Sequence, residues 1–426
     1  MKAVSIARIS VIVAALASGC GGRAATPALP AAAPEEIGLS SAALARITPA
    51  LQAYVDSGKV AGIVAVIARH GRIGYLTATG QMDVERQIPM RTDAVFRIYS
   101  MTKPVIAAAT LVLAEQGKLA LDDPVSKYIP ALADVKVYVS GPADHPVVRD
   151  PDAPMTVRHL LTHTAGLVYG LKQTPVDTLL LRAGLYDPAS TLAQFADSIA
   201  RLPLVFSPGT AWNYSASIDV VGRVIEVASG KPLDRFLEEA IFEPLKMHDT
   251  AFRIRRDMRK RIPVLYAPGE AGLRAVEGGP LSGMFLPGAR FFWASGGLLS
   301  TPADYLRFAQ MLLNGGELDS VRVLTRASVA LMMRNHLPPE LTPIAGPQLV
   351  DEGYGQALAG VVLVDSTRAR LPGSPGIYRW SGYVGTYFWI DPRADLIAMV
   401  WTQFSPGRTY QLEQEFQRLV YDAVIR

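Results

Sequence analysis

A serine and a lysine three positions apart, Ser100 and Lys103, are the residues of this chain whose types and spacing most clearly suggest chemistry. Pro104 and the apolar and small residues at 105–113 predict a buried helix that begins at this pair and ends near Gly117. Residues one turn apart share a helix face, so both side chains are expected to point the same way. A serine hydroxyl becomes a nucleophile when a base takes its proton, and a lysine with a lowered pKa can be that base.

The S-x-x-K pattern alone is weak evidence for catalysis, because a serine that caps a helix and is followed by a solvated lysine gives the same pattern. Two observations favour the catalytic interpretation. Ser100 is the only serine that stands three residues before a lysine, and the chain contains no G-x-S-x-G nucleophile elbow. The start of the predicted helix also offers unpaired N–H groups and a positive dipole end, which suit a developing anion.

The composition describes a large folded protein without a nucleic-acid signature. The chain has 426 residues, of which 50% are hydrophobic and 19% are charged, and its net charge is +4. This length is sufficient for two lobes around a large core. The basic residues are scattered, and the short basic cluster at 253–260 is interpreted as a solvated helix face. We therefore expect no nucleic-acid partner.

The first 20 residues predict export of the protein in a bacterium. Two basic residues precede an apolar run at 9–16 that is too short to remain as a transmembrane helix. The small residues before Cys20 resemble a bacterial lipobox, although Ala17 stands where leucine is usual. We expect residues 1–20 to be a lipoprotein signal peptide, with Cys20 lipidated and the protein anchored in the periplasm at the outer membrane. Ordinary signal cleavage near Ala24 or Ala25 is the alternative.

The rest of the chain predicts an α+β fold with a discontinuous lobe. Residues 21–37 are rich in Ala and Pro and are interpreted as a tether. Strand patterns gather near both ends of the mature chain, and helical patterns fill the middle. We expect an antiparallel sheet flanked by helices in the lobe formed by 38–105 and 290–426, with 106–289 inserted as a helical lobe. The active site is expected in the crevice between the lobes.

A metal site is not indicated. His159 and His163 stand four residues apart, but a zinc protease of this spacing needs a glutamate after the first histidine, and Leu160 is there instead. We expect both histidines to be structural, and we expect no cofactor.

Three motifs, in order, resemble those of the serine β-lactamase and penicillin-binding-protein superfamily, and most closely those of the class C β-lactamase-like esterases called family VIII carboxylesterases. Ser100 to Lys103 matches S-x-x-K, and Tyr214-Ser215-Ala216 matches Y-x-N with alanine in place of asparagine. Trp380-Ser381-Gly382 stands where β-lactamases have K-T-G or a related triplet. The resemblance covers about residues 38–426 and implies the β-lactamase/transpeptidase-like fold.

The resemblance implies a serine hydrolase that cleaves carboxylic esters. Ser100 would form an acyl-enzyme, and Lys103 and Tyr214 would act as the base system. The backbone N–H groups of Ser100 and Tyr383 would form the oxyanion hole. The expected substrate contacts are Trp380, Ser381, Gly382 and Ala216.

Two departures from the family pattern bear on the substrate. Trp380 replaces a lysine that in β-lactamases and peptidases helps to bind the substrate carboxylate, and Ala216 replaces an asparagine that contacts the substrate amide. Both changes favour a neutral, partly apolar ester. The alternatives are a β-lactamase or D-alanyl-D-alanine carboxypeptidase, or a penicillin-binding or acyl-sensing protein with little turnover.

The lipid anchor is a first testable prediction. Cells that express the protein and are fed a fatty-acid analogue should label it, because the analogue enters the lipid that modifies Cys20. The variant Cys20→Ala should not be labelled. Equal labelling of this variant would reject Cys20 as the lipidated residue.

Overall fold

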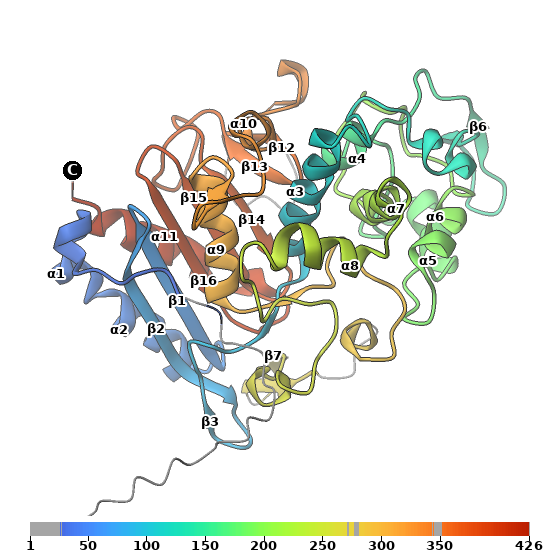
Figure 1. Cartoon of the computed structure of the whole chain (residues 1–426). Coiled ribbons are helices and arrows are strands. Elements are labelled where there is room, and N and C mark those ends of the chain that lie inside the picture. Colours follow the sequence, from blue (N-terminus) through green and yellow to red (C-terminus); the bar gives the residue numbers. More distant parts are fainter. Residues whose placement is uncertain are drawn as a thin grey trace, which may run out of the picture.

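The computed structural model describes residues 26, 28–270, 272–276, 281–342, 344 and 352–425. The predicted signal peptide at 1–20, with Cys20, lies outside these residues. The central element is an eight-stranded antiparallel sheet in the order β12-β13-β14-β15-β16-β1-β2-β3 (Figure 1). Its strands are β1 (Gly62–Arg69), β2 (Arg72–Asp83), β3 (Ile88–Pro89), β12 (Tyr354–Ala357), β13 (Gly360–Leu363), β14 (Tyr378–Gly382), β15 (Thr386–Asp391) and β16 (Leu396–Trp401).

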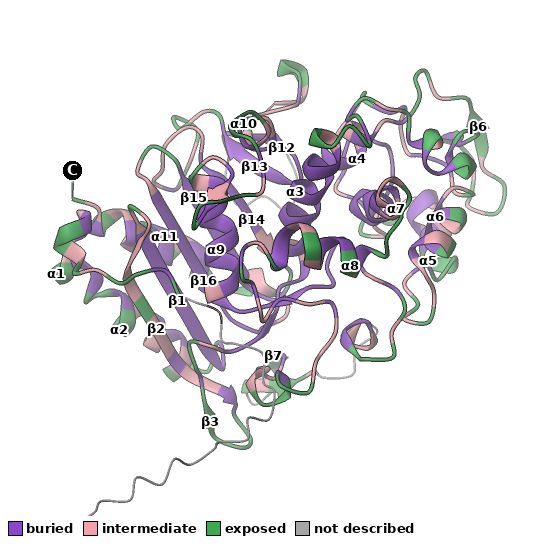
Figure 2. Cartoon of the chain, in the orientation of Figure 1, coloured by how far each residue is buried: buried purple, intermediate pink, exposed green. Residues whose placement is uncertain are grey.

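The sheet joins the two ends of the chain, as the strand patterns predicted. β1 pairs with β2 on one side and with β16 on the other, with Val64 opposite Trp401. β1, up to Arg69 at its end, and β16 are apolar and are buried on both faces (Figure 2). A strand of this kind needs cover on both sides of the sheet, because neither face tolerates water.

Helices from distant parts of the chain supply that cover. Phe388 and Trp389 are neighbours in β15 and therefore point to opposite faces of the sheet. The Phe388 ring lies 5.0 Å from Tyr305 of α9 (Pro302–Leu313), and the Trp389 ring lies 5.7 Å from Phe416 of α11 (Leu412–Ala423). α9 and α11 thus pack on opposite faces, and α2 (Ile47–Asp56) packs beside α11.

A helical lobe lies beside the sheet, at the right of Figure 1. Its helices are α3 (Thr102–Glu115), α4 (Val157–Leu161), α5 (Pro175–Arg182), α6 (Leu192–Ile199), α7 (Ser217–Ser229) and α8 (Leu233–Leu237). α3 is buried almost throughout and packs on α7, so it links the lobe to the sheet. The lobe limits placed at 105 and 290 stay predictions. The remaining elements are α1 (Ser41–Leu44), α10 (Arg326–Met333), β4 (Phe96–Arg97), β9 (Leu299–Ser300), β10 (Glu317–Leu318) and β11 (Val321–Arg322).

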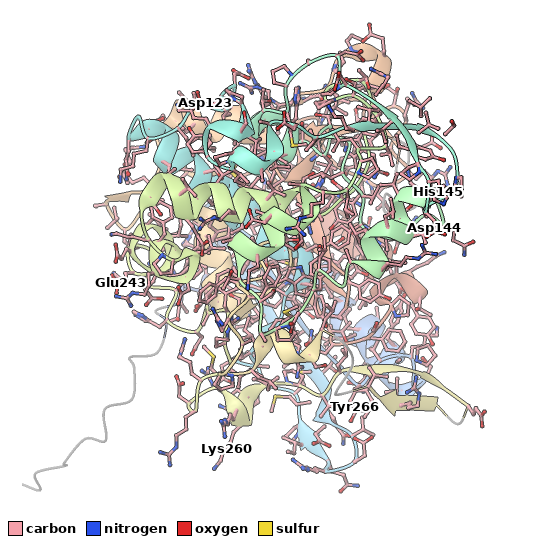
Figure 3. The ribbon with its side chains drawn as sticks, turned by 90° about the vertical axis from the view of Figure 1, so that its right-hand side faces the viewer. Asp123, Asp144, His145, Glu243, Lys260 and Tyr266 are labelled. Carbon is pink, nitrogen blue, oxygen red and sulfur yellow. The ribbon has the colours of Figure 1, made fainter. Side chains whose placement is uncertain are left out.

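Two hairpins interrupt the helical middle of the chain and were not predicted. They are β5–β6 (Val137–Ser140 and Val147–Arg149) and β7–β8 (Tyr266–Gly269 and Gly272–Ala275). The loop of the first carries Asp144 and His145 at the edge of the molecule (Figure 3). All four strands are short, and β5, β6 and β8 are largely exposed, so they carry no alternating apolar pattern that a sequence could reveal.

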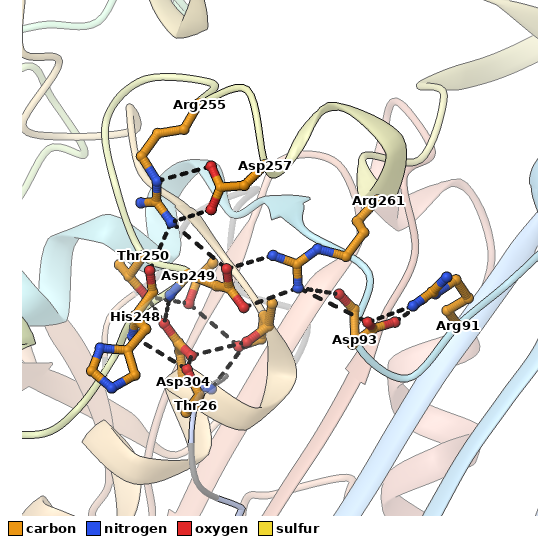
Figure 4. Close-up of polar contacts among 12 residues, drawn as sticks. Thr26, Arg91, Asp93, His248, Asp249, Thr250, Arg255, Asp257, Arg261 and Asp304 are labelled. Atoms are coloured by element: carbon orange, nitrogen blue, oxygen red, sulfur yellow. Dashed lines mark hydrogen bonds and ion pairs between the residues drawn. The ribbon is translucent and has the colours of Figure 1, made fainter. Parts of the chain in front are cut away.

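Residues 28–37, within the range assigned to the tether, pack against the sheet. Leu29 is buried, and backbone hydrogen bonds join Ala32 to Ile73 and Ile73 to Pro30. Nearby, the Thr26 hydroxyl lies 2.5 Å from the buried Asp304 carboxylate at the start of α9 (Figure 4). This segment therefore lies on the folded domain. Among the described residues, no helix is both long and apolar enough to cross a bilayer.

The basic cluster at 253–260 is not a helix face, so that interpretation was wrong. It forms an irregular loop that ends in a single 3-10 turn at Arg259–Arg261. In this loop the half-buried Arg253 donates to the carbonyl groups of Met284, Ala289 and Phe291. Arg255 pairs with Asp257 in the same loop (Figure 4). A guanidinium has five N–H donors, so it can satisfy the carbonyl groups of a loop that has no helix to bond them.

Candidate active site

Ser100 lies at the junction between a short strand and the buried helix, as the sequence predicted. β4 pairs with β9, a single 3-10 turn spans Tyr99–Met101, and α3 begins at Thr102. Pro104 therefore lies in the first turn, where its missing N–H group is not needed. The preceding residue, Tyr99, has a φ of 43°, in the left-handed region that non-glycine residues rarely adopt.

The neighbours of Tyr99 hold this conformation. Its ring packs edge-on against Trp293 at 5.6 Å and lies 5.7 Å from Phe285. A left-handed residue costs about 1–2 kcal/mol, which such aromatic packing can offset. The backbone is thereby turned so that the next side chain, Ser100, faces the cavity described below.

Ser100, Lys103 and Tyr214 meet at one point. The Ser100 Oγ atom lies 2.9 Å from Lys103 Nζ and 2.7 Å from the Tyr214 hydroxyl. Ser100 comes from the 3-10 turn before α3, Lys103 from the first turn of α3, and Tyr214 from the segment just before α7. The serine hydroxyl thus has two partners able to take or give its proton.

Lys103 is completely buried, and burial lowers the pKa of its amine to about 7. The negative charge of Asp219 opposes this shift and raises the pKa of Lys103. Lys103 Nζ also donates to the carbonyl oxygen of Ser295 at 2.7 Å and lies over the faces of the Tyr214 and Tyr169 rings. An amine with a pKa near neutrality can both accept a proton from Ser100 and release it again.

Asp219 is a buried carboxylate that the sequence analysis missed. Its oxygens accept hydrogen bonds from the Ser295 N–H at 2.8 Å, the Ser295 hydroxyl at 2.7 Å and the Tyr186 hydroxyl at 2.9 Å. Burial raises the pKa of Asp219 to about 6. Asp219 thus fixes the residue whose carbonyl group binds Lys103, and adds a negative charge nearby. The sequence signal that could have indicated this residue is an acidic side chain within the apolar stretch of α7, five residues after Tyr214.

Two further tyrosines complete this buried network. Tyr169 bonds the Ser295 hydroxyl at 2.6 Å, and its ring stacks on Tyr214 at 5.5 Å and on Tyr186 at 6.0 Å. Burial raises the pKa of both Tyr169 and Tyr186 well above the usual range. Both phenols therefore stay neutral. Tyr186 donates to the Asp219 carboxylate directly, and Tyr169 bonds the Ser295 hydroxyl that donates to it, so neither adds charge.

His163 lies against the site but is not a metal ligand in this arrangement. Its ring is fully buried and packs on the Tyr214 ring at 4.8 Å. Burial, with the nearby Lys103 charge, lowers the pKa of His163 well below its usual range, so the imidazole is neutral. Within the part of the chain that the structure describes, no three His, Cys, Asp or Glu side chains are placed to hold a metal ion.

A cavity of about 260 Å³ opens at Ser100. The predicted residues Tyr214, Trp380, Ser381, Gly382 and Tyr383 line it, together with Leu171 and a short segment that the sequence analysis did not single out, Pro406, Gly407 and Arg408. Leu171 and Tyr383 are each 60% exposed and form an apolar rim.

Ala216 does not belong to this wall. It is fully buried at the start of α7, where its N–H donates to the carbonyl of Val168, and the residues that line the cavity do not include it. Its position two residues beyond Tyr214 turns it into the helix, away from the open space. The structure therefore gives no contact between Ala216 and a substrate.

Gly382 explains how the end of β14 can lie close to Ser100. A Cβ atom at this position would collide with the carbonyl oxygen of Ile98, two residues before Ser100. Thr386, across the strand pair from Gly382, donates to the same carbonyl at 3.2 Å. A residue without a side chain thus lets the end of β14, and with it Tyr383, lie beside Ser100.

Comparison with known proteins gives the family of the chain. A family model described as Beta-lactamase matches residues 47–422. The chain belongs to the β-lactamase family. It is 36% identical to protein Rv1367c of Mycobacterium tuberculosis over 364 residues, which covers 82% of this chain and 88% of that protein. It is 31% identical to esterase EstB of Burkholderia gladioli over 390 residues, covering 87% of this chain and 93% of the esterase.

A solved structure with the same fold gives a second link to ester chemistry. EstCE1, described as a hydrolase with promiscuous acyltransferase activity, superposes with a TM-score of 0.77 at 28% identity, covering 89% of this chain and 99% of EstCE1. This β-lactamase-family chain is therefore a member of a serine hydrolase superfamily with esterase relatives, and it has the predicted β-lactamase/transpeptidase-like fold.

The Asp219 network generates a prediction about pH. If neutral Lys103 is the base, kcat/KM should rise with pH through a midpoint near 7. Asp219→Asn removes a negative charge that raises the pKa of Lys103, so this midpoint should move to lower pH. The measurement is a pH–kcat/KM profile of both proteins with an ester substrate.

Asp304→Asn is the matched control for this experiment. Asp304 is equally buried and accepts hydrogen bonds from Thr250 and from the Asp249 N–H, but it lies outside the site. This variant should lose stability while keeping the midpoint of the parent protein. A midpoint that stays in place or rises in Asp219→Asn would contradict the role given to Asp219.

Proposed function

We propose that the protein is a carboxylesterase that works through a Ser100 acyl-enzyme with Lys103 and Tyr214 as its proton-transfer groups. The observation that carries this proposal is the contact of Ser100 Oγ with both groups, at 2.9 Å and 2.7 Å. The esterase relatives in the same family support ester substrates.

The acylation step follows from the ionisation of the three groups. Neutral Lys103 accepts the proton of the Ser100 hydroxyl as Oγ attacks the ester carbonyl carbon. Burial raises the pKa of Tyr214, so its phenol keeps its proton and can donate it to the departing alkoxide. The proton held by Lys103 then passes to the Tyr214 phenolate, which restores both groups and leaves a neutral alcohol and an acyl-serine.

The negative charge of the tetrahedral intermediate needs hydrogen-bond donors. The backbone N–H groups of Ser100 and Tyr383 are the donors we propose, since both residues line the cavity and Gly382 brings their chains together. Removal of one such donor typically costs 10²- to 10³-fold in rate. Deacylation repeats the same steps in reverse, with water taking the place of the alcohol.

The test compares two substrate classes side by side. The protein should hydrolyse a short-chain p-nitrophenyl ester faster than a chromogenic cephalosporin, because the relatives that support this proposal include an esterase. Ser100→Ala should lower ester turnover by about 10⁴-fold or more, since it removes the nucleophile. Steady-state rates and a thermal melt should show lost activity in a folded protein.

Ser41→Ala, at an exposed serine in α1, is the matched control and should keep full activity. Two outcomes would reject the esterase proposal. Cephalosporin turnover without ester turnover would favour a β-lactamase or peptidase. Long-lived, stoichiometric labelling by a β-lactam without steady-state hydrolysis would favour a penicillin-binding or acyl-sensing protein.

A further inference from the structure

Arg408 brings a positive charge into the cavity at Ser100, from a part of the chain outside the three motifs. It lines the cavity together with Ser100, Tyr214 and Trp380. Its guanidinium Nη2 atom donates to the hydroxyl of Ser381 at 3.0 Å. Ser381 is the middle residue of the third motif, so the guanidinium lies on the wall that faces the nucleophile.

The segment that carries Arg408 is fixed to the sheet. The Gly407 N–H donates to the carbonyl of Tyr383 at 2.7 Å, and the Tyr387 hydroxyl donates to the carbonyl of Gly407 at 2.7 Å. A Cβ atom on Gly407 would collide with the backbone of Gly385, so this approach requires glycine. Arg408 is therefore held at a defined place on the cavity wall and does not extend freely into solvent.

The guanidinium has no acidic partner in the described part of the chain. None of the residues that line the cavity is an Asp or Glu, and none of the ion pairs found among the described residues includes Arg408. Other cations beside the domain core are paired: Arg261 with Asp249, and Arg379 with Glu413. The bond to the Ser381 hydroxyl satisfies one of five N–H donors and leaves the charge uncompensated.

The charge of Arg408 acts toward the reaction centre. Burial raises the pKa of Tyr214, and the positive charge of Arg408 opposes that increase. The same cavity is otherwise walled by Trp380, Leu171, Tyr383 and Pro406, which offer apolar surface. A guanidinium in such surroundings binds a carboxylate more strongly than it would in open water, and its planar fork can hold both oxygens.

We propose that the substrate is an ester that carries a free carboxylate, in either its acyl or its alcohol part, and that Arg408 binds this carboxylate. The proposal rests on the proposed esterase function and refines its substrate class. The replacement of a motif lysine by Trp380 predicted a neutral ester. The structure places a cation from the segment after β16 next to that tryptophan, which reverses the expectation about charge.

The test uses matched pairs of anionic and neutral esters of similar size. One pair is the mono-p-nitrophenyl ester of adipic acid and p-nitrophenyl hexanoate, which differ by a carboxylate on the acyl side. The other is 3-acetoxybenzoate and its methyl ester, which differ on the alcohol side. The measured quantity is the ratio of kcat/KM for the anionic ester to that for the neutral ester.

In at least one pair, Arg408→Met should lower this ratio about tenfold or more, because a charge-assisted hydrogen bond to the carboxylate is lost. Arg408→Lys should restore part of the ratio, and added salt should lower the ratio of the parent protein. Arg393→Met makes the same charge change in the exposed turn between β15 and β16, at the opposite end of β15 from the cavity, and should keep the parent ratio.

Three results would overturn the proposal. An unchanged ratio in both pairs would show that Arg408 does not bind a substrate carboxylate. An equal loss on anionic and neutral esters would mean that Arg408 supports the reaction centre or the fold instead. No turnover of any of the four esters, anionic or neutral, by the parent protein would reject the esterase function itself, and with it this substrate class.

Discussion

The site depends on a lysine amine that is buried beside a serine hydroxyl. Removing an ammonium from water costs several kcal/mol. Without a nearby negative charge, the pKa of Lys103 would therefore be lower still, and its amine would accept the proton of Ser100 poorly. The nearby carboxylate of Asp219 limits this effect, and the pKa of Lys103 stays near neutrality. A base in this range can accept the proton of Ser100 and give it back within one catalytic cycle.

The sheet and the helical lobe enclose this lysine between them. α3 lies between the sheet and α7, and its first turn is tied to the sheet side by two long-range bonds. The Tyr305 hydroxyl donates to the carbonyl of Met101 at 2.9 Å, and the Leu298 N–H donates to the Thr102 hydroxyl at 3.1 Å. The helical lobe covers the other side with Tyr214 and Asp219. Water is excluded from the Lys103 amine because residues from both lobes surround it.

Much of the fold and the centre of the site could be predicted, because these features depend on residues that are close together in the sequence. The spacing of Ser100 and Lys103 is one helical turn, and Pro104 marks where that turn begins. β1 and β16 carry apolar runs near the two ends of the chain, which predicted that both ends share the sheet. The cluster at 253–260 was assigned wrongly, since arginines that bond loop carbonyls look the same in sequence as arginines on a helix face.

The sequence by itself determined that Ser100 and Lys103 lie together at the start of a buried helix, and it determined the fold family, because each follows from neighbouring residues or from ordered motifs. Only the tertiary structure decided what surrounds them. It brought Asp219 to Ser295, placed Ala216 behind the cavity wall, and set Arg408 beside Ser381. Such contacts join residues far apart in the chain, so no local spacing encodes them. The charge that a substrate meets is therefore a property of the folded cavity and not of the third motif alone.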